Sequence, residues 1–223
     1  MSDRVAVIPA YRAAKMIRPI VEQVLSLGLP VIVVDDGSAD GTSSEARKAG
    51  ATVVTRPANG GKGASLREGF AVALRDGYDW VLTLDADGQH LPREIPRFLE
   101  AAERGEADLI LGNRMSAPKG MPLGRRLTNG IMSWLLSRVS GQRVPDTQCG
   151  FRLISRSVLE RILLTSDRFE IDSEVVVKTA RAGFRIASVP VSSVYIQHAS
   201  FIRPFRDTIR FLRFLRSVRG EGG

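Results

Sequence analysis

Residues 81–89 combine an apolar run with two closely spaced carboxylates, and this combination constrains the fold more than any other feature of the sequence. Val-Leu-Thr-Leu at 81–84 is typical of a buried strand, and Asp85 and Asp87 follow directly. Because burying an unpaired charge costs several kcal/mol, both aspartates are expected just beyond the strand. Open α/β sheets bind their ligands at that carboxyl edge. Two hard oxygen donors there suit Mg²⁺ or Mn²⁺ in contact with a substrate phosphate.

Other metal sites are excluded or disfavoured by the residues present. An EF-hand needs Gly at loop position six and Glu at position twelve, and counting from Asp85 those positions hold His90 and Pro96. A single cysteine, Cys149, rules out an internal disulfide and a Cys-rich zinc site,. Two histidines disfavour a His-ligated zinc centre,. An ordinary Asp-Gly turn remains the alternative when residues 85–88 are taken alone.

Apolar β-rich runs alternate with amphipathic helical patterns through the first half of the chain. This alternation predicts an α/β fold, with a mostly parallel, Rossmann-like sheet flanked by helices on both faces. Strands are expected at residues 4–9, 30–35, 51–56, 79–85 and 107–112. Helices are expected at residues 15–27, at 40–49 with Asp40 as N-cap, at 63–76 and after Pro92.

The alternation breaks after Arg114. A Pro/Gly-rich, basic loop at residues 115–126 is expected to act as a mobile lid. Beyond it we expect a polar loop at 146–152, helices at 128–140, 157–164 and 172–182, and an edge strand at 185–194.

Length and charge set the broad class of protein. The 223 residues fit one domain, expected at 1–200, followed by a basic tail at 201–223,. No stretch reaches the ~18 apolar residues that span a bilayer, and the N-terminal apolar run is too short for a signal peptide, so a cytoplasmic protein is expected. The net charge of +8 favours an anionic partner: nucleic acid, lipid headgroups or a phosphorylated substrate,. Carboxylates at the strand ends and few aromatic residues argue against nucleic acid.

Polar residues suited to a nucleotide follow each early strand. Tyr11 offers an aromatic face, and Asp36 offers a carboxylate for ribose hydroxyls or a base edge,. Residues 60–63, Gly-Gly-Lys-Gly, open a helix whose N-terminus favours negative charge,; a tight βα turn is the alternative for them. The P-loop spacing and the Gly-x-Gly-x-x-Gly fingerprint are both absent, which excludes a P-loop ATPase and a dinucleotide-dependent dehydrogenase.

Taken together, segments 9–11, 34–41, 59–63, 85–90 and 112–114 resemble the family 2 inverting glycosyltransferases. The closest branch is that of the dolichol- or polyprenol-phosphate mannosyl and glucosyl transferases, and the resemblance covers residues 4–195. It implies a GT-A fold that binds a nucleotide-diphosphate sugar, of the GDP-mannose or UDP-glucose type, through Mg²⁺ or Mn²⁺. The acceptor implied is a polyprenyl or dolichyl phosphate.

The resemblance also implies roles for individual residues. The nucleoside would be held by Pro9, Tyr11, Val34 and Asp36. The metal would be held by Asp85, Asp87 and Gln89, with Lys62 and Ala86 among the other substrate contacts. Arg114 would contact phosphate, and Asp87 and Arg114 are expected to be catalytic.

Residues 146–152 are similar to the family's loop near the acceptor phosphate, with Cys149 in place of the common serine. We expect Cys149 to be a packing residue, because inversion needs no covalent intermediate. Gln148 and Arg152, together with Arg125 and Arg126, are expected to contact the acceptor, since Arg suits bidentate oxyanion contacts. A basic solvated loop is the alternative for the last two. After residue 190 the chain lacks an Arg and a Ser-Lys pair that the resemblance leads one to expect.

The acceptor decides which carboxylates take part in catalysis. A lipid phosphate is largely dianionic at neutral pH and needs little help from a general base. A hydroxyl acceptor, soluble or in the cell envelope, would need one, and Asp172 or Glu174 are the candidates. A solvated first helical turn is the alternative for Glu174. A hydroxyl acceptor is therefore the alternative function, and a non-enzymatic nucleic-acid-binding module is a distant third.

The C-terminal tail is basic and amphipathic. On a helical wheel Arg206, Arg210 and Arg213 cluster opposite a broad apolar face, which is typical of a helix lying in a membrane interface. We expect peripheral association with the inner face of the membrane through this tail. Docking on the protein's own core or in a dimer interface is the alternative. A membrane partner protein or a homo-oligomer would also hold the protein at the bilayer.

Overall fold

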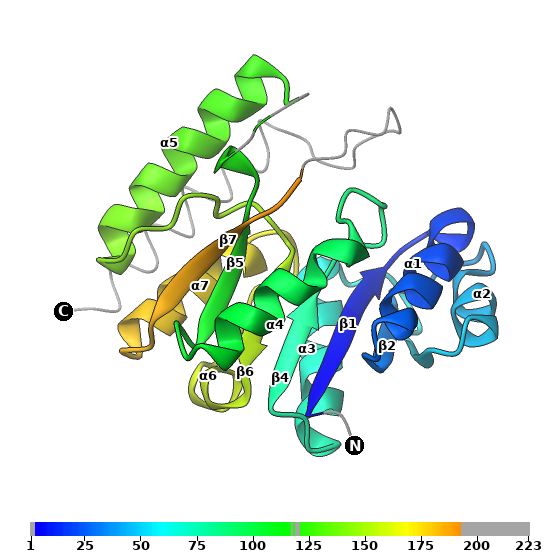
Figure 1. Ribbon diagram of the computed structural model, residues 1–223. Coiled ribbons are helices and arrows are strands. Elements are labelled where there is room, and N and C mark those ends of the chain that lie inside the picture. The colour runs from blue at the N-terminus through cyan, green and yellow to red at the C-terminus, as the bar shows by residue number, and fades with distance from the viewer. Residues whose placement is uncertain (1–2, 117, 119–120, 193–223) are drawn as a thin grey trace.

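The structure is a computed structural model that describes residues 3–116, 118 and 121–192. Its centre is a seven-stranded sheet in the order β3-β2-β1-β4-β6-β5-β7 (Figure 1). The strands are β1 Arg4–Ala10, β2 Val31–Asp35, β3 Thr52–Thr55, β4 Trp80–Thr83, β5 Leu109–Asn113, β6 Arg152–Ser155 and β7 Ile186–Pro190.

Strand β6 was not predicted, and it is the antiparallel member of the sheet. It pairs with β4 and β5, placing Leu153 beside Leu82 and Ile110. The sequence Arg-Leu-Ile-Ser is too short to show a strand pattern, and its two ends are polar. Only the space between β4 and β5 makes it a strand. The other neighbouring pairs are parallel, so the prediction of a mostly parallel sheet flanked by helices is confirmed.

Each face of the sheet is covered by helices because alternate strand residues point to opposite sides. In β1, Ala6 and Ile8 face one apolar cluster, and Val5 and Val7 face the other. The first cluster includes residues of α1 Ala14–Ser26, α2 Thr42–Lys48 and α4 Ile95–Glu103. The second includes residues of α3 Lys62–Arg75, α6 Arg156–Arg161 and α7 Ile171–Arg181. Burying one such Val or Ile side chain contributes about 1.5–3 kcal/mol.

Most helix boundaries lie within one or two residues of the prediction, but α6 ends at Arg161 rather than at 164, and the start of α5 Leu123–Ser140 changes the setting of two predicted site residues. Helix α5 begins within the expected lid, so Arg125 and Arg126 are helical rather than loop residues. A short 3-10 helix, η2 Arg114–Ser116, shortens that loop from the other side. Helix α2 has Gly41 as its N-cap, although Asp40 Oδ1 still accepts a hydrogen bond from the Thr42 N–H at 3.1 Å.

Helix α5 packs on α7 through the buried side chains of Leu136 and Val177. A second 3-10 helix, η1 Pro92–Glu94, leads into α4. The predicted tail at 201–223 lies outside the described residues, as does the end of the predicted strand at 185–194. Within the described part of the chain, every helix is too short or too polar to cross a membrane.

Candidate functional site

The carboxyl ends of β1, β2, β4 and β5 lie along one edge of the sheet, because these four strands run in the same direction. The polar segments that follow them therefore converge, as the strand pattern predicted. Strand β6 runs the opposite way and begins at this edge, with Arg152 opposite Thr83. The loop at residues 146–151 is thereby brought to the same place as the residues after β4.

An ion cluster of three side chains lies at the centre of this edge. The Lys62 Nζ atom is 2.8 Å from Asp85 Oδ1 and 3.0 Å from Asp172 Oδ2. Lys62 opens α3, Asp85 follows β4, and Asp172 lies in the first turn of α7. Burial alone would raise the pKa of Asp85, but Lys62 and the other nearby cationic groups together outweigh it and lower that pKa to about 2. Burial likewise opposes the charge on Lys62, yet Asp172 and Asp85 raise its pKa above the ordinary value.

Gly150 lies directly against this ion cluster. A Cβ at this position would be 2.5 Å from Asp85 Oδ2 and 2.7 Å from Lys62 Nζ. The Thr83 hydroxyl donates a 2.7 Å hydrogen bond to the Gly150 carbonyl and holds the loop in place. A side chain at this position would require the ends of the Asp85 and Lys62 side chains to shift.

The Gly-rich turn before α3 is locked by residues 165–167. A Cβ at Gly61 would lie 2.6 Å from the Asp167 carbonyl oxygen, and one at Gly63 would overlap that of Ser166. Gly61 also has a φ of +100°, which favours glycine,. Glu174 fixes the opposing segment by accepting hydrogen bonds from the backbone N–H groups of residues 165 and 166. The position of Lys62 is thus set by close backbone contact on both sides.

Asp36 supports the same turn. Its two carboxylate oxygens accept hydrogen bonds from the Gly60 and Gly61 N–H groups at 2.9 and 2.7 Å, and Arg56 lies 3.2 Å away. The sequence predicted Asp36 as a nucleoside contact. The structure shows that this buried carboxylate also shapes the Gly-rich turn.

His90 orders the segment that carries the predicted metal ligands. Its Nδ1 accepts a 3.1 Å hydrogen bond from the Asp85 N–H, and its ring stacks on Phe151 with the ring centroids 5.3 Å apart. Burial lowers the pKa of His90, which favours a neutral ring. Asp87 is exposed, and its Oδ1 accepts the Gln89 N–H at 2.9 Å. This role of His90 was not predicted from the sequence; the feature that could have indicated it is the position of His90 five residues after Asp85.

The oxygen donors near β4 suit a metal that is held in part by its substrate. Among the described residues, no three His, Cys, Asp or Glu side chains come together to hold a metal ion. Asp85 and Asp87 supply two carboxylates in one short segment. Mg²⁺ is commonly bound by one or two carboxylates, with substrate phosphates and water completing its coordination. The residues present therefore fit a dication that arrives with a diphosphate.

Arg114 forms a buried ion pair that was not predicted from the sequence. Its Nε and Nη2 atoms donate to the two Asp146 oxygens at 2.8 and 2.9 Å, and its backbone N–H donates to the same carboxylate. Asp146 is fully buried. Because the pairing is bidentate, the guanidinium plane is fixed at the end of β5. The sequence feature that could have indicated this partner is Asp146 itself, a carboxylate at the start of the 146–152 loop.

Arg152 has a different place from the one expected. Its side chain is 2% exposed, and its nitrogens donate to the carbonyl oxygens of Thr147, Cys149 and Asp172. These bonds tie the loop to α7. The guanidinium is therefore bound within the protein, and an acceptor contact by Arg152 stays a prediction.

Glu174 and Cys149 are also held within the protein. The Glu174 carboxylate, besides its bonds to residues 165 and 166, accepts a 2.7 Å hydrogen bond from Lys178 Nζ. Burial opposes its charge, but these bonds lower its pKa. Burial raises the pKa of Cys149 to about 12, which agrees with a packing residue rather than a nucleophile.

The residues predicted to hold the nucleoside differ in accessibility. Val34 is fully buried in the apolar cluster under α3, so its side chain is not exposed to a ligand. Pro9 and Tyr11 are half-buried at the end of β1, with the Arg12 guanidinium 5.2 Å from the Tyr11 ring centroid. Ala86 is buried between the two predicted metal carboxylates.

Gln148, Arg125 and Arg126 are the remaining residues predicted to contact the acceptor. Gln148 is half-buried in the 146–151 loop, and its N–H donates to Asp146 Oδ1 at 3.2 Å. Arg125 is half-buried and Arg126 exposed on the first turn of α5.

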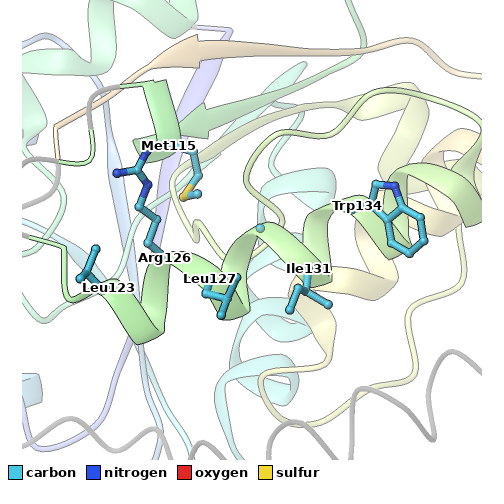
Figure 2. A pocket seen from close by; sticks show the side chains of 7 residues that line it. Met115, Leu123, Arg126, Leu127, Ile131 and Trp134 are labelled. Carbon is cyan, nitrogen blue, oxygen red and sulfur yellow. The ribbon is translucent and has the colours of Figure 1, made fainter.

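Helix α5 carries a line of exposed apolar side chains. Leu123, Leu127, Ile131 and Trp134 are 80%, 67%, 51% and 56% exposed and follow one another at helical spacing,. With Met115, Arg126 and Gly130 they line an open groove of about 640 Å³ (Figure 2).

The surroundings of this groove are basic. Helix α5 contains three arginines and no acidic residue, and the Arg138 guanidinium lies 4.9 Å from the Trp134 ring centroid. One of the residues that line the groove, Met115, directly follows Arg114 in the chain.

Comparison with known proteins shows which family and which relatives this chain resembles. The profile of glycosyl transferase family 2 matches residues 5–163. The chain is 34% identical over 176 residues to an undecaprenyl-phosphate mannosyltransferase of Micrococcus luteus, covering 74% of this chain and 71% of the relative. It is 28% identical over 241 residues to a UDP-N-acetylglucosamine–dolichyl-phosphate N-acetylglucosaminyltransferase of Methanococcus voltae, covering 97% and 96%.

Solved structures agree on the fold. A glucosyl-3-phosphoglycerate synthase from Mycobacterium tuberculosis, crystallised with Mn²⁺, UDP and phosphoglyceric acid, superposes with a TM-score of 0.74 at 22% identity. The match covers 96% of this chain and 76% of that one. The GT-A fold that the sequence predicted is thereby confirmed.

Proposed function

Because this chain belongs to glycosyl transferase family 2 and is a glycosyltransferase, we propose that it moves a sugar from a nucleotide-diphosphate sugar to a polyprenyl phosphate. The observation that carries the choice of acceptor is the groove on α5. It is apolar, it has arginines at its margins, and one of its lining residues, Met115, follows Arg114 in the chain; a phosphate attached to an isoprenoid chain matches these features.

On the donor side, the nucleoside is proposed to lie across the ends of β1 and β2, near Pro9, Tyr11 and Asp36. The diphosphate is proposed to lie near Asp85 and Asp87. A divalent cation held there would neutralise charge on the departing diphosphate. We propose that Arg114 contributes to phosphate binding, with Asp146 holding its guanidinium in a fixed orientation.

The carboxylates near the acceptor side support a phosphate acceptor over a hydroxyl. A general base must reach the acceptor proton. Glu174 is occupied by backbone N–H groups and Lys178, and Asp172 is paired with Lys62. A phosphate dianion needs no such base, because it already carries a nucleophilic oxygen. The proposed step is an in-line displacement that inverts the anomeric carbon, with the nucleoside diphosphate leaving on the opposite face.

A direct transfer assay tests this proposal. The full chain would be incubated with Mn²⁺ and radiolabelled GDP-mannose, UDP-glucose or UDP-N-acetylglucosamine. Each donor would be offered undecaprenyl phosphate, dolichyl phosphate, phosphoglycerate or simple sugars. We expect label in the lipid phase and its loss in excess chelator. Label only in water-soluble products would contradict the lipid acceptor and favour a hydroxyl acceptor.

Residues 1–200 are proposed to form the catalytic domain and residues 201–223 a membrane-contacting tail on the cytoplasmic side. A membrane partner protein or self-association would serve the same purpose. The amphipathic pattern of the tail in the sequence supports this arrangement,.

A further inference from the structure

We propose that Lys62 is an internal counter-ion of the metal site, and that it makes tight binding of a dication depend on the donor diphosphate. The ammonium group occupies the carboxylate cluster before any metal arrives. This inference rests on the proposed function, because it takes Asp85 as a metal ligand. It concerns a different property, namely the order in which metal and nucleotide bind and the effect of each on the affinity for the other.

The position of Lys62 is not explained by the stability of its helix. Lys62 is the first residue of α3, where the helix dipole disfavours a positive charge. The side chain is 11% exposed, and its Nζ atom bridges two carboxylates that belong to different elements. Gly61 and Gly63 fit against residues 165–167 with no room for a Cβ. The backbone is thus packed so that this lysine reaches the site.

The charges that surround the cluster are already balanced without a metal. Asp85 and Asp172 face Lys62, and Arg152 Nη2 lies 3.6 Å from Asp172 Oδ1. His90 Nδ1 is 4.0 Å from Asp85 Oδ2. A dication approaching Asp85 must therefore share that carboxylate with an ammonium group, and it meets repulsion from it.

A diphosphate changes this balance. Its negative charges attract the dication and also draw the Lys62 ammonium from Asp85 toward the phosphates, so the dication no longer shares that carboxylate with Lys62. Binding of metal and binding of nucleotide then strengthen each other by the same factor, as thermodynamic linkage requires. Free dication binds weakly, and the metal–nucleotide complex binds tightly.

Titration calorimetry on the full chain tests the inference with Mn²⁺ alone, and with Mn²⁺ in the presence of UDP or GDP. In Lys62→Met, the affinity for Mn²⁺ alone should rise roughly tenfold. This factor corresponds to the repulsion energy between a unit charge and a dication about 5 Å apart in a water-like dielectric. The strengthening of Mn²⁺ binding by nucleotide should shrink. Lys62→Arg keeps the charge and should leave the Mn²⁺ affinity near that of the parent chain.

Lys48→Met is the matched control, because it removes an exposed lysine that is also paired with a carboxylate, Glu45. It should change neither affinity. Asp172→Asn should not strengthen Mn²⁺ binding, since Lys62 then remains with Asp85 alone. If Lys62→Met fails to fold, as judged by circular dichroism, Lys62→Gln replaces it with a polar side chain of similar reach.

The outcomes separate this inference from the proposed function. An unchanged or weaker affinity for Mn²⁺ in a folded, uncharged variant at position 62 would overturn the counter-ion role, because a purely structural lysine gives that result. Absence of Mn²⁺ binding in the parent chain, with and without UDP or GDP, would instead remove the metal-dependent function on which the inference rests.

Discussion

Replacing Gly150 by alanine is the sharpest test of the site geometry, because it adds one methyl group at the ion cluster. The new Cβ would lie 2.5 Å from Asp85 Oδ2 and 2.7 Å from Lys62 Nζ, whereas ordinary van der Waals contact begins at 3.4 Å. The carboxylate or the loop must therefore shift by about 0.9 Å. The φ of Gly150 is not in the left-handed region, so alanine brings crowding without backbone strain.

Gly150→Ala is expected to have a moderate effect on stability and a large effect on the transfer rate. Overpacking of this kind costs about 1–3 kcal/mol of stability, which leaves a domain of this size folded. A displacement of about 1 Å at a reacting group can reduce the rate roughly 100-fold. We therefore expect a folded protein with a lower melting temperature, and a sugar-transfer rate that falls by about two orders of magnitude in the assay with polyprenyl phosphate.

Gly124→Ala provides the control, since a Cβ there meets nothing within 4 Å. It should retain activity and melt at or slightly above the parent temperature, because alanine favours a helix more than glycine does. If Gly150→Ala keeps full transfer activity, the cluster formed by Asp85 and Lys62 is not part of the reacting site, and the reasoning above is refuted.

Four further results are expected. Asp87→Ala should abolish transfer while circular dichroism and melting remain close to the parent; retained activity would exclude Asp87 as a metal ligand. Asp146→Ala should destabilise the fold by about 3–5 kcal/mol in urea unfolding, because it leaves Arg114 as a buried charge without its bidentate partner; a loss below about 1 kcal/mol would show that the pair is not structural. Trp134→Ser should weaken co-sedimentation with anionic lipid vesicles and raise the KM for polyprenyl phosphate but not for a short-chain analogue; equal effects on both acceptors would place the isoprenoid elsewhere. The pKa of Asp85 is lowered to about 2 from about 3.9 in an unfolded chain, so its ionisation stabilises the fold above about pH 4 and this stabilisation is lost as the pH falls toward 2. The free energy of unfolding of Asp85→Asn should therefore depend less on pH in this range; an unchanged pH dependence would contradict the lowered pKa.

Much of the fold was predictable because it depends on local patterns. The buried runs before Ala10, Asp35 and Asp85 are long enough to be read as strands, and their polar ends indicated a ligand-binding edge. Strand β6 was not predictable in the same way. Its four residues become a strand only because β4 and β5 leave a gap with unpaired backbone groups on both sides.

The candidate site was predictable by residue type more than by contact. Asp85, Lys62 and Asp172 were each singled out, yet the sequence does not indicate that one ammonium group joins the two carboxylates. Arg114 and Arg152 show the same limit, since both were expected to meet phosphate. Arg114 is paired with the buried Asp146, which lies 32 positions away in the chain. Arg152 donates to three carbonyl oxygens. Only the folded chain brings these partners together.

The sequence by itself determined the class of the fold, the edge of the sheet where the candidate site lies and the family, because each depends on short segments whose order and spacing are visible in the chain. Tertiary structure alone decided how the charges at that edge are paired and where an apolar groove opens along α5. Pair energies depend on distances of a few ångströms between residues such as Lys62 and Asp172, and a helix face becomes a groove only once the neighbouring elements have left it uncovered.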